Sequence, residues 1–112
     1  MTGLRRGDIA LVDFNPAKGG EIGKLRPAIV MSTEEELEIL ETAIVIPLST
    51  CIEKDAAPYR LFVPKRERLL HDSDACIYEI RALSKQRIKS KVASLTPKEL
   101  SAVQHALCQL LG

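Results

Sequence analysis

Residues 6–32, RGDIALVDFNPAKGGEIGKLRPAIVMS, contain two apolar segments joined by a long glycine-rich loop. The segments at 9–14 and 26–31 are apolar and partly β-branched, which is typical of β-strands. Turn-forming residues exclude a regular element between them: Pro16, Gly19, Gly20 and Gly23. Hairpin loops usually contain about 2–5 residues, so the loop at 15–25 is either a disordered insertion or a binding loop on a rigid base, and we favour the binding loop.

Further short segments have the composition of strands. They are apolar or alternating, and they lie at 42–48, 59–63, 75–83 and 88–95. A parallel sheet would need a helix after each strand, so five to six short strands at this spacing predict a small antiparallel barrel. Pro27 is expected to start its strand and Pro47 to end the regular pairing of its own, because proline donates no backbone hydrogen bond. The charged connector at 65–74 is expected to hold one helical turn.

Two helices are predicted. Residues 33–41 have acidic residues behind Ser32 or Thr33, a possible N-cap, and favour a short helix or turn. Thr96, Pro97 and Glu99 form a capping box with proline in the first turn, so the last helix begins there. Its apolar residues recur at three- and four-residue steps and give one face to pack on the barrel: Leu100, Val103, Leu107, Leu110 and Leu111.

The composition limits the classes of function. At 112 residues, the chain is expected to form one domain at 1–112, short enough that a second subunit would usefully cover exposed apolar surface. The 46% hydrophobic content excludes a disordered chain. Tryptophan is absent and aromatic residues make up 4%, which counts against RNA-binding modules that stack bases on rows of aromatic side chains.

Charge is unevenly distributed, although the net charge is only +1. Acidic residues crowd the segment at 34–41, whereas basic residues follow one another from Arg81 to Lys98 with no acid between them. A basic stretch of this kind can bind phosphate. Lysines that protect a strand edge from pairing with other chains give the same pattern, so the charge alone leaves both interpretations open.

Nothing in the sequence indicates export, a membrane or a metal. Residues 1–8, MTGLRRGD, lack the apolar run of a signal peptide, and no segment approaches the ~20 apolar residues of a membrane span, so a cytoplasmic protein is expected. The cysteines form no C-x-x-C pair, which predicts free thiols: Cys51, Cys76 and Cys108. Metal-ligand and phosphate-loop motifs are absent, so no metal or cofactor is expected.

The remaining residue types fit chemistry on RNA. His71 and His105 lie far from the glycine-rich loop in sequence and pair with no nucleophile or second base, so a two-histidine mechanism is unsupported. RNA supplies its own nucleophile, the 2′-hydroxyl, so an enzyme needs only to orient that group, remove its proton and stabilise charge on the phosphate. An arginine guanidinium with a neighbouring hydroxyl can do much of this.

Three groups of motifs follow one another along nearly the whole chain. They are RGD, DFNP, GE and RPAIV within 6–30, VIPLS at 45–49, and IRALSKQRI at 80–88. In this order and spacing they resemble the MazF/PemK family of toxin–antitoxin ribonucleases. The resemblance implies a mainly β fold, an SH3-like (CcdB/PemK-like) antiparallel barrel with a C-terminal α-helix and one or two short helical turns.

The resemblance also implies a function. It is that of a type II toxin, a metal-independent and sequence-selective endoribonuclease that cleaves single-stranded RNA and inhibits translation and growth. The substrate is mRNA, with rRNA and tRNA as further candidates, and the products carry 2′,3′-cyclic phosphate and 5′-hydroxyl ends. The implied partners are a second copy of the chain in a homodimer, a cognate MazE-like antitoxin, and DNA through the antitoxin complex alone, with no membrane.

Individual residues take roles from the same resemblance. Arg26 would stabilise and protonate, Ser49 would orient the phosphate, and Glu21 would assist. Family members more often carry threonine at the hydroxyl position, and Thr50 directly behind Ser49 leaves the register open by one residue. The RNA-binding residues implied are Asn15, Lys18, Lys24, Thr50, Arg81, Lys85 and Arg87.

Two other functions remain open. A non-enzymatic toxin similar to CcdB would trap DNA gyrase and would not need Arg26 and Ser49. Its binding helix ends in an aromatic and acidic tip, whereas this chain ends in residues 108–112, CQLLG. An inactive SH3-like binding module is the other alternative, and the intact glycine-rich loop counts against such decay.

Overall fold

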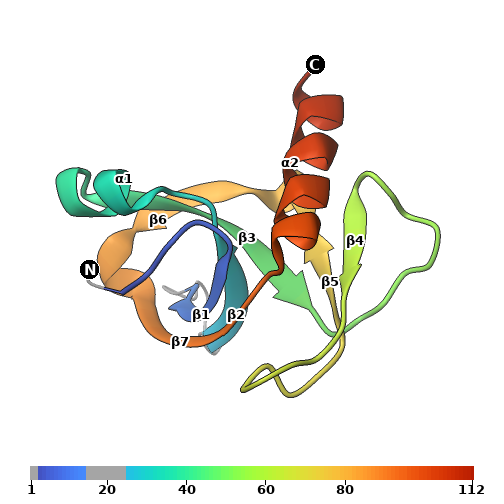
Figure 1. The fold of residues 1–112 in the computed structure, drawn as a ribbon, viewed down its shortest axis with the longest axis horizontal. Helices are drawn as coiled ribbons and strands as arrows, with labels where there is room; N and C mark the ends of the chain where they lie inside the picture. Colours follow the sequence, from blue (N-terminus) through green and yellow to red (C-terminus); the bar gives the residue numbers. More distant parts are fainter. Residues whose placement is uncertain (1–2, 15–24) are drawn as a thin grey trace, which may run out of the picture.

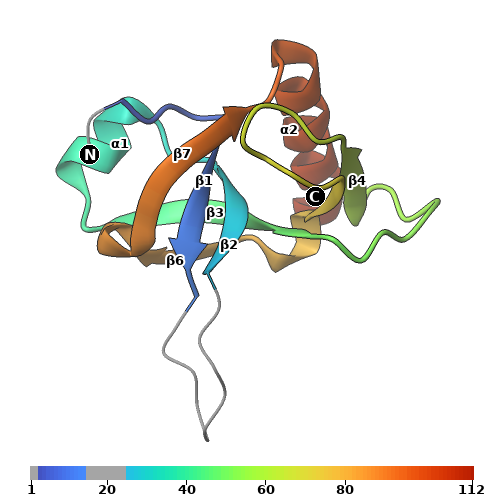
Figure 2. The same ribbon diagram turned by 90° about the horizontal axis from the view of Figure 1, so that it is seen from below.

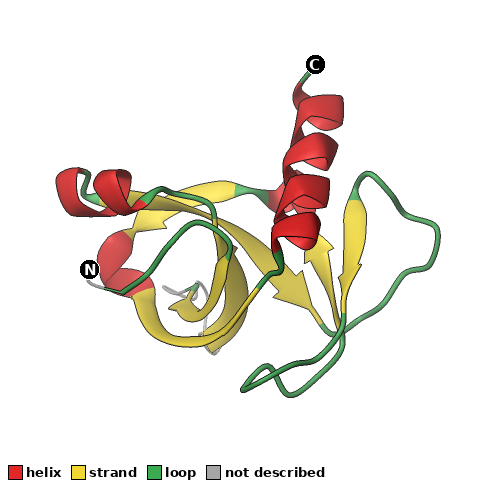
Figure 3. Ribbon diagram, in the orientation of Figure 1, coloured by secondary structure: helices red, strands yellow, loops and turns green. Residues whose placement is uncertain are grey.

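The computed structural model describes residues 3–14 and 25–112. Within these ranges the chain forms seven strands, two α-helices and two short 3₁₀-helices (Figures 1 and 3). The strands are β1 (Asp8–Asp13), β2 (Leu25–Val30), β3 (Thr42–Ser49), β4 (Arg60–Val63), β5 (Ser73–Cys76), β6 (Arg81–Ser84) and β7 (Ile88–Ser94). The helices are α1 (Glu34–Ile39), α2 (Pro97–Leu111), η1 (Ile77–Glu79) and η2 (Lys85–Arg87).

All strand pairs are antiparallel, and they form one strongly curved sheet (Figure 1). The order is β4-β5-β3-β2-β1-β7, and β6 pairs with β3 beside this path. Irregularities in the register of β1 and β7 increase the bend of the sheet. The predicted mainly β class with a C-terminal helix is confirmed, although hydrogen bonding among the described residues leaves the barrel open between β4 and β7.

Apolar clusters lie on both faces of the sheet, because successive side chains of a strand point to opposite faces. The α2-side cluster includes Ile9, Ile29, Ile46 and Leu48, and Val103 of α2 is buried against it. The α1-side cluster includes Val12, Ala28, Val30 and Val45, and Leu37 of α1 is buried in it. The two helices lie well apart in both Figure 1 and Figure 2, so each covers its own part of the sheet.

Both helices begin as predicted from the sequence. Thr33 caps α1 and Thr96 caps α2, each within a complete capping box that includes a glutamate three residues later. These reciprocal hydrogen bonds satisfy backbone N–H groups that have no partner within the helix. The short 3₁₀-helices η1 and η2 supply further helical turns.

Prolines occupy strand positions that the sequence prediction had excluded. Pro47 lies inside β3, which continues to Ser49, and Pro27 is the third residue of β2. The Ile44 carbonyl accepts a hydrogen bond from Met31 N–H on the β2 side, at 2.8 Å. By the alternation of an antiparallel strand, the backbone of Pro47 points to the other side, between the stretches of β3 that pair with β6 and with β5. The prediction was therefore wrong, because the missing N–H groups fall where the ladder has a gap.

Two other segments differ from their predictions. The strand expected at 75–83 is divided into β5 and β6 by η1, which raises the number of strands to seven. A hydrogen bond from Ile80 N–H to the Ile77 carbonyl closes this turn at 3.2 Å. The connector at 65–74 contains a tight turn bridged by Arg66 and Leu69 in place of a helical turn. Periodicity did not predict the break at η1, because the residues on both sides of it have the composition of strands.

Candidate functional site

Arg26 and Ser49 lie where β2 and β3 part. The pairing of these strands ends with Ala28 opposite Pro47. Continuing the same antiparallel register by two residues sets Arg26 opposite Ser49. Opposite residues of an antiparallel pair have their side chains on one face. The side chains of Arg26 and Ser49 therefore belong to the face of the α1-side cluster, and both residues are half-buried.

Further guanidinium groups lie at this end of the α1-side cluster. Phe14 packs against the cluster, and the Arg81 guanidinium carbon lies 5.6 Å from the centroid of the Phe14 ring. Arg87 Nη1 donates a hydrogen bond to the Asp13 carbonyl oxygen at 3.2 Å. Arg81 and Arg87 are thus held near the end of β1, while Arg26 pairs with β1 opposite Val12. This concentration of positive charge is suited to phosphate groups.

Thr50 lies on the other face of the sheet. It lines a mainly apolar pocket of about 270 Å³ together with Pro27, Leu48 and His71. Leu48 belongs to the α2-side cluster, so this pocket is separated by the sheet from the face of Arg26 and Ser49. The continued register therefore places Ser49 on the same face of the sheet as Arg26, whereas Thr50 lines the pocket on the other face.

The Ser49 hydroxyl is held by the backbone just after its strand. Cys51 N–H donates a hydrogen bond to Ser49 Oγ at 3.1 Å. A serine that accepts from the amide two residues ahead forms a local turn that restricts its own side chain. The Ser49 hydroxyl donates to no other residue among those described, so its proton is available to an acceptor on this face.

A buried ion pair lies on the same face, next to Ser49. Asp74 of β5 is opposite Ser49 of β3, and 2% of its surface is exposed. Arg60 Nη1 contacts Asp74 Oδ2 at 3.4 Å and donates to the Cys51 carbonyl oxygen at 2.8 Å. Glu53 N–H donates to Asp74 Oδ2 at 2.8 Å. No sequence motif marked this cluster, although an aspartate directly before the apolar residues 75–77 was a signal for it.

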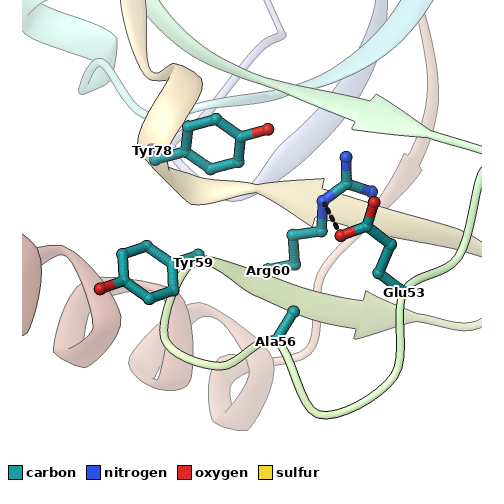
Figure 4. A pocket seen from close by; sticks show the side chains of 5 residues that line it. All are labelled: Glu53, Ala56, Tyr59, Arg60 and Tyr78. Atoms are coloured by element: carbon teal, nitrogen blue, oxygen red, sulfur yellow. Dashed lines mark ion pairs between the residues drawn. The ribbon is translucent and has the colours of Figure 1, made fainter.

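Arg60 is surrounded by groups that stabilise its charge. Its pKa is raised above the ordinary value, chiefly by the side chain of Tyr78 and also by the carboxylates of Glu53 and Asp74, while burial opposes the change. Figure 4 shows the Arg60 guanidinium between Tyr78 and Glu53, and the ion pair to Glu53 measures 3.7 Å. The pocket drawn there has a volume of about 300 Å³. Arg60 therefore remains a fixed cation beside the Ser49 turn.

Other predicted residues are placed elsewhere or lie outside the described ranges. Lys85 donates from Nζ to the Leu37 carbonyl oxygen of α1 at 2.7 Å, where a cation stabilises the end of the helix. The structure thus does not bring Lys85 to Arg26 and Ser49. The predicted site residues that lie outside the described ranges are Asn15, Lys18, Glu21 and Lys24.

Residues 3–14 and 25–112 contain neither a metal-binding cluster nor a membrane-spanning helix. In that part of the chain, no group of three or more His, Cys, Asp or Glu side chains could hold a metal ion. None of its helices has the length and apolar character needed to cross a membrane. All three cysteines are free thiols, and burial raises the pKa of the Cys76 thiol.

Known proteins share this fold. A family model described as PemK-like, MazF-like toxin of type II toxin-antitoxin system matches residues 5–111. The chain is similar to a chain of the MazE-MazF structure from Deinococcus radiodurans, with 22% identity, 97% of this chain and 96% of that chain covered, and a TM-score of 0.79. It is similar to the Mycobacterium tuberculosis toxin MazF-mt6, with 15% identity, 93% and 95% covered, and a TM-score of 0.76. It is also similar to an endoribonuclease in complex with its cognate antitoxin from a mycobacterial species, with 18% identity, 100% and 96% covered, and a TM-score of 0.75.

At these identities the solved structures show a shared fold, whereas the family model covers nearly the whole chain. The motifs at 6–30, 45–49 and 80–88 that carried the resemblance all fall within the matched residues. The predicted family is therefore confirmed, and the chain belongs to the PemK-like, MazF-like toxins of type II toxin–antitoxin systems.

Proposed function

We propose that this toxin is a metal-independent, sequence-selective endoribonuclease that cleaves single-stranded RNA. The observation that carries the proposal is the antiparallel register of β2 and β3, which ends with Ala28 opposite Pro47 and, continued by two residues, puts Arg26 and Ser49 on one face of the sheet. Arg81 and Arg87 add positive charge near the same end of β1. The endoribonuclease named among the similar structures supports the same activity for this chain.

The reaction needs no nucleophile from the protein. The RNA 2′-hydroxyl loses its proton to solvent and its oxygen attacks the adjacent phosphorus. The bond from phosphorus to the 5′-oxygen breaks, the 5′-oxygen gains a proton, and a 2′,3′-cyclic phosphate and a 5′-hydroxyl result. Negative charge develops on the phosphate oxygens during the attack. Arg26 stabilises this charge through a planar pair of N–H donors. Because a guanidinium scarcely releases its proton, we assign Arg26 charge stabilisation and leave protonation of the 5′-oxygen to water.

Ser49 orients the phosphate. Its Oγ already accepts from Cys51 N–H, so its O–H can donate to a phosphate oxygen beside Arg26. Thr50 lines a pocket across the sheet and takes no part in this step. This geometry supports Ser49 as the hydroxyl residue. Glu21 remains the proposed assistant in proton transfer, as the family resemblance implies.

The wider role follows from family membership. We propose that RNA cleavage, of mRNA above all, inhibits translation and growth in the cytoplasm, and that a cognate MazE-like antitoxin blocks the site. The antitoxin complexes among the similar structures support this partner. A homodimer would cover exposed apolar surface, and DNA would be contacted through the antitoxin complex alone.

Cleavage in the presence of EDTA tests the proposal. We expect the purified chain to cut a long single-stranded transcript in EDTA and to leave 5′-hydroxyl ends. Arg26→Ala should lower the cleavage rate by about 10²–10³-fold, as expected for loss of a donor to the developing charge. Ser49→Ala should lower it by about 10–100-fold, because it removes one hydrogen bond to a charged group.

The matched controls are Arg26→Lys and Thr50→Ala. Lysine keeps the charge but loses the planar pair of donors, so its rate should fall between those of the wild type and Arg26→Ala. Thr50→Ala should cleave at nearly the wild-type rate. Equal cleavage by wild type and Arg26→Ala would remove the proposed role of Arg26, and no cleavage of any RNA by the wild type would contradict the enzyme.

A further inference from the structure

We infer that Arg60, anchored on buried Asp74, is a positioning residue that fixes the direction of the Ser49 hydroxyl. The inference rests on the proposed function above and adds to it a pair of residues from β4 and β5. Neither residue belongs to the motifs at 6–30, 45–49 and 80–88 that carried the resemblance. The pair is connected to Ser49 by a short, continuous series of hydrogen bonds.

The series begins at the hydroxyl itself. Serine has no methyl group on Cβ to limit its χ1 rotamers, so a free Ser49 side chain would sample several directions. Cys51 N–H donates to Ser49 Oγ at 3.1 Å and selects one of them. The oxygen then has an acceptor site occupied while its proton stays free to donate. The direction of this proton depends on where the Cys51 peptide is held.

Arg60 holds the Cys51 residue in place. Its Nη1 donates to the Cys51 carbonyl oxygen at 2.8 Å. Cys51 is exposed and lies outside any helix or strand, so it has no ladder hydrogen bonds to fix its position. The next fixed point is Glu53, whose N–H donates to Asp74 Oδ2 at 2.8 Å. Arg60 and Asp74 therefore fix the segment that follows Ser49 at two points, the Cys51 carbonyl and the Glu53 N–H.

The Arg60–Asp74 ion pair that holds this segment is itself buried. Asp74 has 2% of its side chain exposed and Arg60 has 13%. A buried ion pair of this kind gives little net stability, because desolvation of two charges offsets their attraction. Apolar side chains would serve a fold at least as well at these positions. Arg60 Nη1 contacts both the Cys51 carbonyl oxygen and Asp74, and Arg60 Nε contacts Glu53. A lysine side chain has a single nitrogen and could not make this set of contacts.

A purely structural role for the pair gives different expectations. It would anchor the connection between β3 and β4, and its loss would lower stability without a specific effect on Ser49. A positioning role requires that the effect on cleavage pass through the rotamer of residue 49. The experiment must therefore separate the fold, the backbone near Cys51 and the catalytic step.

The test replaces both charges together. Arg60→Ala alone would leave Asp74 buried without a partner and could unfold the chain, whereas Arg60→Met with Asp74→Leu removes both charges and is expected to preserve the fold. We expect this double variant to lower kcat about tenfold, with KM changed by less than about twofold, which is the size of one mispositioned hydrogen bond. The matched control removes the distant Arg66–Glu99 pair by Arg66→Met with Glu99→Gln, and its kcat should equal that of the wild type.

A rescue identifies the pathway. Threonine carries the methyl group that restricts χ1, so Ser49→Thr should depend less on the Cys51 turn. We expect Ser49→Thr combined with the Arg60 and Asp74 changes to recover most of the lost kcat. A double variant with wild-type kcat would overturn the inference. A loss of kcat that Ser49→Thr does not reduce would also overturn it in favour of the structural role.

An assay that does not need cleavage completes the test. Hydrogen exchange of the Cys51 amide, followed by NMR on the full chain, should accelerate about 3–10-fold in Ser49→Ala and in the Arg60 and Asp74 double variant, but not in the Arg66 control. Unchanged exchange in the double variant would overturn the positioning of Cys51 even if the wild type cleaves RNA. If the Cys51 exchange rates change as expected but the wild type cleaves no RNA, the proposed function is contradicted and the hydrogen-bond series still stands.

Discussion

The ion pair between Arg66 and Glu99 should make the stability of this toxin depend on acid pH. Glu99 opens α2, and its carboxylate receives two N–H groups of Arg66, with Nη2 at 2.6 Å from Oε2. The Arg66 side chain lowers the pKa of Glu99 from 4.5 to about 2, with a further contribution from Thr96 and with burial acting against it. The connector at 65–74 is thereby tied to the last helix.

The magnitude follows from the pKa. A lowering from 4.5 to about 2 corresponds to about 3 kcal/mol of stability when the carboxylate is charged. A quarter of the Glu99 side chain is exposed, so solvent screening reduces this to about 2 kcal/mol. Because the pKa is lower in the folded state, this contribution is fully present above pH 4.5 and is lost as the pH falls towards 2.

Glu99→Gln isolates this contribution. Glutamine can keep the capping box with Thr96, so the change removes the charge and little else. We expect the variant to lose about 2 kcal/mol at pH 7, or roughly 8 °C in Tm, and the difference from wild type to vanish near pH 2. Urea unfolding at fixed protein concentration, from pH 7 to pH 2, measures it.

The matched control is Glu38→Gln in α1. Glu38 is exposed and carries the same charge, so its replacement should change stability by less than about 0.5 kcal/mol at every pH. A loss in Glu99→Gln that is no larger than that of the control would refute the reasoning. So would a loss that stays constant between pH 7 and pH 2, since the ion pair must disappear when the carboxylate is protonated.

Two other predictions concern α1 and the RNA surface. Leu37→Ala should lower the free energy of unfolding by about 3 kcal/mol, because Leu37 is fully buried, whereas Ile39→Ala in the same helix, 75% exposed, should have little effect in the same urea titration. Arg81→Ala should reduce the slope of log Kd against log salt concentration by about 0.7, the value for one phosphate contact on single-stranded RNA, while Lys98→Ala on α2 should leave the slope unchanged. Equal slopes for wild type and Arg81→Ala would remove Arg81 from the RNA surface.

Local patterns in the sequence were enough to predict much of the fold. Thr33 and Thr96 mark the helix starts through capping boxes, which depend only on residues within one turn. Strands are recognisable from short apolar segments because both faces of β1, β2 and β3 are buried. The order of motifs along the chain was sufficient for the family, which the family model confirms.

The positions of breaks in the ladder could not be predicted in the same way. Pro27 and Pro47 lie within strands because their missing N–H groups face gaps between neighbouring strands. Those gaps depend on η1 and on the point where β2 and β3 part, and both arise from the pairing of distant segments. The rule that excludes proline from strand interiors considers only the strand that contains the proline, and it does not take account of where the neighbouring strands end.

Sequence by itself determined that an arginine before Pro27 and a hydroxyl near residue 49 were the residues to consider. Only the tertiary structure decided that Ser49 shares a face with Arg26 while Thr50 lies across the sheet, and that Lys85 binds α1 instead. It also revealed Arg60 and Asp74, which no motif marked. The physical reason is that a strand alternates its faces at every residue, so a register that depends on remote partners decides which neighbours each side chain has.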